Sequence, residues 1–151
     1  MKFVVEDNLS KVGRWLRFLG HDVVIIKGPL SRELLFSYGD RMFITTSRKW
    51  SEWATGVNIN NLLVPRHDWR LQLCLVLKRL GLEASLNLRK CVFCGSDLVS
   101  INRENVKDKI PPAAYAHAYD FTLCPNCSMV FWKGTHYGGM IRTLRNVISQ
   151  C

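Results

Sequence analysis

The sequence predicts an α/β fold in which a parallel sheet flanked by helices is followed by a four-cysteine ribbon and a closing helix. Short β-branched apolar runs alternate with amphipathic segments over residues 1–87, as in sheets with right-handed crossovers. Two Cys-x-x-Cys pairs follow within residues 88–136, and an amphipathic segment occupies residues 137–151. With 48% hydrophobic residues, the chain can bury one substantial core beside a small satellite module. We expect three parts with these boundaries.

Apolar patterning places the strands and helices of the first part. Apolar runs predict strands at residues 3–5, 23–26, 41–46 and 57–64, and the remaining segments predict helices at residues 9–19, 31–38, 47–54 and 68–80. Asp7 or Asn8 is suited to cap the first helix. Gly20 is suited to end it, because glycine accepts the left-handed backbone of a helix C-terminus. Ser31 is suited to cap the second helix.

An apolar stripe marks the closing helix, which we expect at about residues 137–149. Its members recur at helical spacing: Met140, Ile141, Leu144, Val147 and Ile148. Such a stripe needs an apolar partner surface, so the helix should pack back on the α/β domain.

Four cysteines carry the clearest chemical signal in the chain. They form two Cys-x-x-Cys pairs on short turns, a spacing that suits a tetrahedral zinc ion: Cys91, Cys94, Cys124 and Cys127. Disulfides are the alternative, which a secreted chain would favour. We predict one structural zinc ion in a zinc ribbon whose two pairs are separated by an insertion at residues 95–123. Cys74 lies in an apolar run and should be a core residue, whereas Cys151 is uninformative.

The beginning of the sequence does not resemble a secretory signal. Its apolar run is short and is followed at once by Glu6 and Asp7. No apolar stretch approaches the roughly 20 residues that span a bilayer. We therefore expect an intracellular protein, cytoplasmic or nuclear, with reduced cysteines and no membrane partner.

Positive charge is concentrated in the first part of the chain. The net charge is +9; residues 1–90 contain 15 Lys and Arg against 8 Asp and Glu, while residues 91–151 contain 6 against 4. A basic surface attracts polyanions, of which nucleic acid is the commonest inside cells. A role in solubility alone is the alternative.

Three blocks of the sequence resemble the Mut-seven carboxy-terminal domain family, in the family's order. They are Phe3–Val23, Cys91–Cys94, and Cys124–Cys127 leading into Val130–Tyr137. The resemblance covers nearly the whole chain and implies a PIN-like nuclease fold fused to a zinc ribbon that acts on RNA. Some members stand alone, and others form the C-terminal domain of a 3′-to-5′ exoribonuclease connected with RNA silencing. This chain could be such a domain.

The acidic residues of a PIN-type nuclease are only partly present. Such enzymes hold Mg²⁺ or Mn²⁺ with three or four carboxylates at the strand ends. The resemblance implies acids after the first strand, at the start of the second helix and after the third strand. Glu6, beside Asp7, matches the first position, but the others are Ser31 and Ser47. Hydroxyls bind hard cations poorly, and two basic residues follow Ser47, so we expect no catalytic residues. An active enzyme would use Glu6, Asp7 and either Glu33 or Asp40.

A basic stripe on the first helix is the leading candidate for RNA binding. Lys11, Arg14 and Arg17 recur every three residues, opposite an apolar face that should enter the core. Trp15 is expected in the core. A solvated basic face without a ligand is the alternative.

Further candidates combine charge with aromatic rings, a composition that suits single-stranded nucleic acid. They are Arg48, Lys49, Trp50, Lys133, His136, Arg142 and Arg145. We expect Trp50 to be more exposed than Trp53, and a groove between ribbon and sheet to be basic on both sides. His136 has three possible roles: a phosphate contact, a packing residue, or a neighbour of the zinc shell.

Three functions remain open at this point. The preferred hypothesis is a non-catalytic domain that binds single-stranded RNA with little sequence preference and assists a tethered or associated exonuclease. The second is an endoribonuclease dependent on Mg²⁺ or Mn²⁺. The third is a protein-interaction scaffold with an apolar docking face, formed by residues such as Phe36, Tyr38, Tyr115 and Tyr119.

Overall fold

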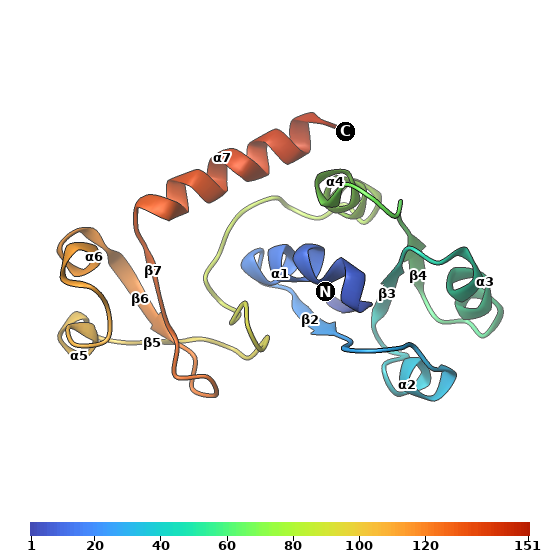
Figure 1. Cartoon of the computed structure of the whole chain (residues 1–151), viewed down its shortest axis with the longest axis horizontal. Coiled ribbons are helices and arrows are strands. Elements are labelled where there is room, and N and C mark those ends of the chain that lie inside the picture. Colours follow the sequence, from blue (N-terminus) through green and yellow to red (C-terminus); the bar gives the residue numbers. More distant parts are fainter.

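Four parallel strands form a sheet at one end of the molecule, as a computed structural model covering residues 1–151 shows (Figure 1). The strands are β1 (Lys2–Val5), β2 (Asp22–Ile25), β3 (Met42–Thr45) and β4 (Asn61–Leu63), in the spatial order β2-β1-β3-β4. The register places Val4 opposite both Val24 and Phe43. The expected α/β sheet flanked by helices is therefore confirmed.

Helices cover both faces of this sheet. The helices are α1 (Ser10–Phe18), α2 (Arg32–Ser37), α3 (Arg48–Gly56) and α4 (Trp69–Arg79). Because side chains alternate along a strand, Phe3 and Val5 pack with α1 and α4 on one face, and Val4 packs with α2 and α3 on the other. Trp15 is buried in the first of these layers, as expected, with its ring stacked 5.8 Å from that of Trp69.

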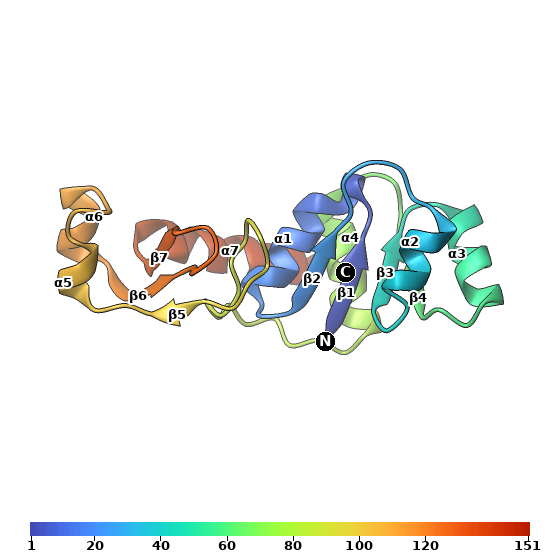
Figure 2. The ribbon, with the colours of Figure 1, turned by 90° about the horizontal axis from the view of Figure 1, so that it is seen from below.

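An antiparallel three-stranded sheet forms the other end of the molecule (Figure 2). Its strands are β5 (Val99–Ser100), β6 (Tyr119–Leu123) and β7 (Val130–Lys133), and the insertion adds the short helices α5 (Arg103–Val106) and α6 (Pro112–His117). The insertion has a small core of its own, in which Val106 and Phe121 are buried.

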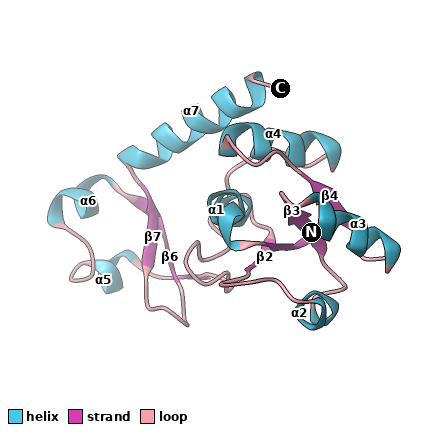
Figure 3. Cartoon of the chain, turned by 45° about the vertical axis from the view of Figure 1, so that its right-hand side comes forward, coloured by secondary structure: helices cyan, strands magenta, loops and turns pink.

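The last helix, α7 (Thr135–Ser149), returns from the ribbon to the α/β domain and lies beside α4 (Figure 3). Leu144 and Val147 are buried in the same core as β1 and α1, which confirms the predicted packing of the apolar stripe. Cys74 is buried in this core as expected, but Cys151 is paired with it as a disulfide, with Cα atoms 6.1 Å apart. The expectation that all cysteines are reduced was therefore wrong for Cys74 and Cys151.

Several local expectations were wrong. The first helix is not capped by Asp7 or Asn8, because both lie in a preceding 3-10 turn (Asp7–Leu9), and the Asn8 amide donates to Thr46 Oγ1 at 3.0 Å instead. The fourth strand is shorter than predicted, because residues 57–60 form the turn that follows α3, where Asn58 has a φ of +60°.

The expectation that Gly20 ends the first helix is confirmed, because Gly20 follows α1 with a φ of +89°. No helix is both long enough and apolar enough to cross a membrane.

The predicted apolar docking face does not exist as one surface. Phe36 and Tyr38 lie on or beside α2, whereas Tyr115 and Tyr119 belong to α6 and β6 at the opposite end of the molecule (Figures 1 and 2). Tyr38 and Tyr115 are also half-buried. Sequence alone could not show that these rings belong to separate modules.

Candidate metal centre and nucleic-acid interface

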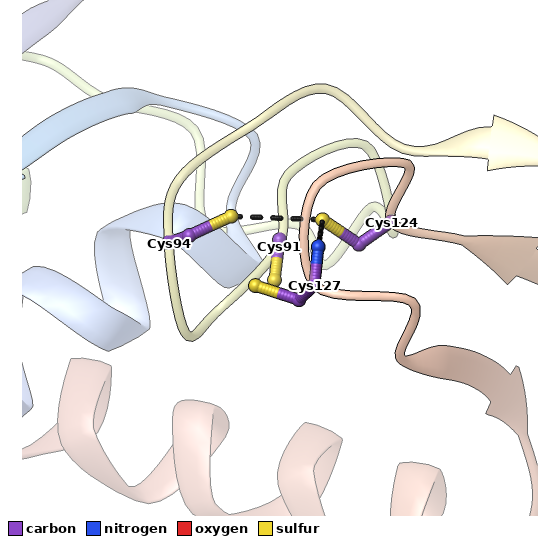
Figure 4. Close-up of side chains that lie close together, drawn as sticks. All are labelled: Cys91, Cys94, Cys124 and Cys127. Carbon is purple, nitrogen blue, oxygen red and sulfur yellow. Dashed lines mark hydrogen bonds between the residues drawn. The ribbon is translucent and has the colours of Figure 1, made fainter.

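The two cysteine loops face each other between the α/β domain and the ribbon (Figure 4). Each loop is closed in the same way: Gly95 N donates to Cys91 O, and Ser128 N donates to Cys124 O, both at 2.8 Å. All four Sγ atoms lie within 4.8 Å of one another. The four cysteines could therefore hold one metal ion, as the sequence predicted.

The spacing of the sulfur atoms excludes a disulfide in this group. Sγ of Cys94 and Sγ of Cys124 are 3.6 Å apart. A disulfide requires about 2.05 Å, whereas tetrahedral zinc–sulfur bonds of about 2.3 Å place neighbouring sulfurs about 3.8 Å apart. All four cysteines are free in the structure, so the alternative of disulfides between them is wrong, and the geometry suits a tetrahedral metal site.

The cysteine group favours unequal protonation in the absence of a cation. Burial disfavours the Cys94 thiolate, but hydrogen bonds from Ser96 and Asn126 outweigh burial and lower its pKa to about 5. The side-chain hydrogen bond with Cys94 raises the pKa of Cys127 to about 12, and burial raises the pKa of Cys91. Four thiolates so close together repel one another, so a divalent cation is the natural means of stabilising all four.

Arg17 joins this centre to the α/β domain. Its side chain is only 5% exposed. Its Nε and Nη2 donate to Val23 O at 3.2 and 2.8 Å, and its Nη1 donates to Val92 O at 2.9 Å. Burial lowers the pKa of Arg17, and the nearby Cys94 and Cys91 oppose that shift. The prediction of an exposed Arg17 on the outer stripe of the first helix was therefore wrong.

Glu6 follows the end of β1, where the sequence placed the first nuclease acid, and its carboxylate accepts three hydrogen bonds from the chain. It accepts hydrogen bonds from Thr45 Oγ1 at 2.8 Å, Thr46 Oγ1 at 2.6 Å and Thr46 N at 3.2 Å. Glu6 is 8% exposed and Thr45 is fully buried. Two hydroxyls, from β3 and from the residue after it, thus contact the carboxylate of Glu6 directly.

Both serines at the expected acidic positions are helix caps. Ser31 Oγ accepts from Leu34 N at 3.1 Å at the start of α2, as predicted, and Ser47 Oγ accepts from Trp50 N at 3.3 Å at the start of α3. A serine has one side-chain oxygen, which the cap uses. Aspartate caps helices as well, and it has a second oxygen left for a metal.

The other acidic candidates do not converge with Glu6. Asp40 precedes β3 and therefore lies at the opposite edge of the sheet, where it pairs with Lys2 at 3.7 Å. Asp7 is exposed and pairs with Lys27 at 3.4 Å, and Glu33 is exposed in the first turn of α2. Among all His, Cys, Asp and Glu side chains, the four cysteines are the one group of three or more that lie close enough to share a metal ion.

The predicted RNA-binding residues lie on three separate surfaces. Lys11 and Arg14 are exposed on α1, and Lys11 Nζ lies 4.5 Å from the centre of the Trp69 ring. Arg48 and Lys49 lie at the start of α3, where Lys49 is exposed. Trp50 and Trp53 are both half-buried, and their rings pack edge-to-face with centroids 5.5 Å apart.

The remaining predicted residues lie on or near α7. Lys133 pairs with Asp120 at 3.0 Å, and this hydrogen bond raises the pKa of Lys133. His136 is exposed and packs edge-to-face on Trp132 at 6.0 Å, while Arg142 and Arg145 are exposed. The cavity between α1 and the ribbon is lined by ten hydrophobic residues and His136. A second cavity contains Arg14, Arg17 and Lys27, but the ribbon contributes only Val92, Phe93 and Cys94 to it. The predicted groove that is basic on both sides was therefore wrong on the ribbon side.

A basic groove at the ends of β3 and β4 was missed from the sequence. It has a volume of about 560 Å³, and its lining includes Thr46 and three arginines: Arg48, Arg66 and Arg79. Arg66 follows the fourth strand closely, so the rule that ligands gather at the carboxyl ends of parallel strands could have found it. Arg79 comes from α4, and only the fold brings it to this groove.

The model of one family, described as the Mut7-C RNAse domain, matches residues 1–144 of the 151 residues. The chain belongs to this family. No curated protein and no solved structure gave a significant match. The resemblance shown by the three sequence blocks is thus confirmed, and a nuclease-like or RNA-related role follows for this Mut7-C domain.

Replacing Cys94 with Ser should abolish metal binding by this Mut7-C domain and unfold the ribbon, because metal binding and folding are coupled at such sites. Metal content measured by mass spectrometry should fall from one ion per chain to nearly none. Cys151→Ser is the control: it also exchanges a cysteine for serine and opens the disulfide with Cys74, but it lies outside the group and should keep the metal. Full metal content in Cys94→Ser would mean that the ligand set is wrong.

Replacing Arg17 with Ala should lower the free energy of unfolding by about 3 kcal/mol, since it removes three hydrogen bonds from a buried charged group. Arg17→Lys should not restore stability, because an ammonium cannot reach both carbonyls in the geometry of a guanidinium. Exposed Arg14→Ala should change stability by about 0.5 kcal/mol or less. Urea denaturation and the rate of metal release to a chelator measure both effects. Equal stability of the Arg17 and Arg14 variants would contradict the role of Arg17 in joining the metal centre to the α/β domain.

Proposed function

We propose that this Mut7-C domain binds single-stranded RNA through its backbone phosphates, with little sequence preference, and does not cleave it. The observation that carries the proposal is the carboxyl edge of the sheet. A nuclease needs convergent carboxylates at this edge. In this chain the carboxylate of Glu6 is hydrogen-bonded to two threonine hydroxyls, and a groove beside it is lined by Arg48, Arg66 and Arg79.

Three arginines in one groove favour phosphate as the ligand. A guanidinium is always charged and presents its donors in a fork that matches two phosphate oxygens. The same charges repel a divalent cation. A contact of this kind follows the RNA backbone and does not read base edges, so it supports binding without sequence preference.

The lack of cleavage is supported by how the edge uses its polar atoms. Glu6 already accepts three hydrogen bonds, while Ser31 and Ser47 each commit their hydroxyl to a helix N-terminus. Hydrolysis by bound metal ions needs several carboxylate oxygens around the ions. In our proposal the fold of a nuclease is retained as a binding scaffold.

Zinc is the metal we propose for the cysteine group. Four cysteines in a tetrahedral arrangement close the coordination shell, which is typical of structural zinc and leaves no position for a substrate. In this role Cys91, Cys94, Cys124 and Cys127 would hold the ion, and the ion would hold the two loops together. Its contribution would be to the stability of the ribbon.

The context of the domain is also part of the proposal. A domain that holds RNA would raise the effective concentration of substrate at a tethered exoribonuclease in RNA silencing, in the cytoplasm or nucleus. Catalysis would reside in the tethered enzyme. The support for this context is the family resemblance alone.

A metal-dependent endoribonuclease is the second candidate. The family's description as an RNAse domain and the position of Glu6 at the end of β1 favour it. This function requires Glu6 to exchange its hydroxyl partners for Mg²⁺ or Mn²⁺, with Asp7 and Glu33 moving toward it.

End-labelled single-stranded RNA incubated with the zinc-loaded protein should stay intact in both EDTA and Mn²⁺, while binding weakens as salt is raised. The reason is that phosphate contacts release counterions, whereas no cluster of carboxylates is present to hold a catalytic metal. Gel electrophoresis follows both binding and decay. Cleavage that requires Mn²⁺ and disappears in the double variant Glu6→Gln, Asp7→Asn would establish the enzyme instead. Absence of binding at low salt would reject the RNA-binding function.

Replacing Arg66 and Arg79 with Ala should weaken binding to all RNA sequences to a similar degree. The slope of log affinity against log salt should decrease by about 0.7 for each phosphate that the variant no longer neutralises. Arg89→Ala is the control, because Arg89 does not line the groove. Fluorescence anisotropy at several salt concentrations gives the slopes. Equal slopes for the double variant and the control would remove this groove from the interface.

A further inference from the structure

Phe93 is an exposed aromatic ring held on a rigid loop. It is 62% exposed, although phenylalanine usually lies in a core. The loop is fixed on both sides of the ring, because Cys91 and Cys94 belong to the metal centre and Val92 O accepts from Arg17. An exposed ring on a pre-organised loop loses little entropy when it contacts a ligand.

Two cavities of different chemistry meet at this ring. One is apolar, with a volume of about 260 Å³, and its lining includes Phe93, Phe131, Trp132 and Met140. The other has a volume of about 360 Å³ and is lined by three basic residues, Arg14, Arg17 and Lys27, together with four apolar residues and Cys94 of the metal centre. Val92 and Phe93 line both cavities. A ligand that reaches both cavities would place an apolar part in one and an anionic part in the other, with Phe93 beside each.

The basic cavity contains a buried cation with unused donors. A guanidinium has five N–H groups, and the three hydrogen bonds of Arg17 leave two of them without an acceptor. Arg17 is 95% buried and lines the cavity, given its exposed fraction of 5%. Arg14 is exposed beside it, and Lys27 makes only a loose, exposed pair with Asp7. These groups match the oxygens of one phosphate.

We propose that one nucleotide of single-stranded RNA binds here, with its base stacked on Phe93 at the apolar cavity and its phosphate in the basic cavity. This inference rests on the proposed RNA-binding function and adds a base-binding subsite to it. An unpaired nucleotide joins a flat aromatic base to a phosphate by a short linkage, which is the combination the two cavities require.

The lining of the apolar cavity also fits binding without sequence preference. His136 is the one residue of its lining that is not hydrophobic, so few hydrogen bonds to base edges are available. Stacking depends on the π-face that every base has. The subsite should therefore distinguish RNA with bases from a bare ribose-phosphate chain, and it should distinguish the four bases only weakly.

The test compares a short oligouridylate with an abasic ribose-phosphate chain of equal length, by fluorescence anisotropy on the zinc-loaded full chain. Wild type should prefer the oligouridylate. Phe93→Ala should weaken oligouridylate binding about 5- to 150-fold, which corresponds to about 1–3 kcal/mol for one stacked base. It should leave the abasic chain unaffected and keep the salt slope. Phe93→Trp should retain the preference, and Phe36→Ala, which removes a ring of similar exposure on α2, should have no effect.

Two further variants separate the two parts of the subsite. Phe93→Leu keeps apolar volume without a ring, so it should lose the preference even if Phe93→Ala loses metal or folds poorly. Arg14→Ala with Lys27→Ala should lower the salt slope for both probes by about 0.7 for each phosphate that is no longer neutralised. If wild type binds both probes equally, or the Phe93 variants keep the preference, the subsite is rejected while RNA binding stands. If wild type binds neither probe, the proposed function is rejected as well.

Discussion

The buried guanidinium of Arg17 connects the two halves of the molecule. Burying such a charge costs several kcal/mol unless it is compensated. Here three hydrogen bonds to Val23 O and Val92 O offset the cost. A divalent ion with four thiolates has a net charge of about −2, so a loaded centre would attract Arg17 further. Gly95 allows this close packing of Arg17 against the cysteine loop: its φ is +81°, and an added Cβ would lie 3.1 Å from Arg17 Nε. Folding of the loop, metal binding and docking on the sheet are thus linked.

The carboxyl edge of the sheet depends on a different constraint, the hydrogen bonding of Glu6 by three neutral donors. A carboxylate that accepts from two threonine hydroxyls and a backbone N–H needs no cation to be stable when buried. The presence of Ser31 and Ser47 where a nuclease has acids costs the fold little, because serine caps a helix about as well as aspartate. Metal-binding capacity can therefore be lost from this edge without loss of the architecture that supported it.

The fold, the cysteine centre and the family were accessible from the sequence, because each depends on local spacing: strand and helix periods, paired cysteines and the stripe on α7. Arg17 was not. Residues three apart on an α-helix drift by about 60° per step, so Arg17 lies about 120° from Lys11 and reaches the buried side. Asn8 was misjudged because its partner Thr46 belongs to a distant segment after β3. The groove with Arg79 and the cavities at Phe93 likewise require contacts between distant segments, which spacing along the chain does not encode.

The strand order β2-β1-β3-β4 places both basic regions along one edge of the sheet. Lys27 follows β2, Glu6 follows β1, and Arg48 and Arg66 follow β3 and β4. Strands are about 4.8 Å apart, so this edge extends roughly 14 Å from β2 to β4. Glu6 at its centre would repel a phosphate chain if it were exposed, but it is 8% exposed and bonded to hydroxyls. If RNA binds as we propose, a strand passing from the Phe93 cavities to the arginine groove would meet a shielded carboxylate, and the hydrogen bonds that hold Glu6 would also leave the path open for the backbone.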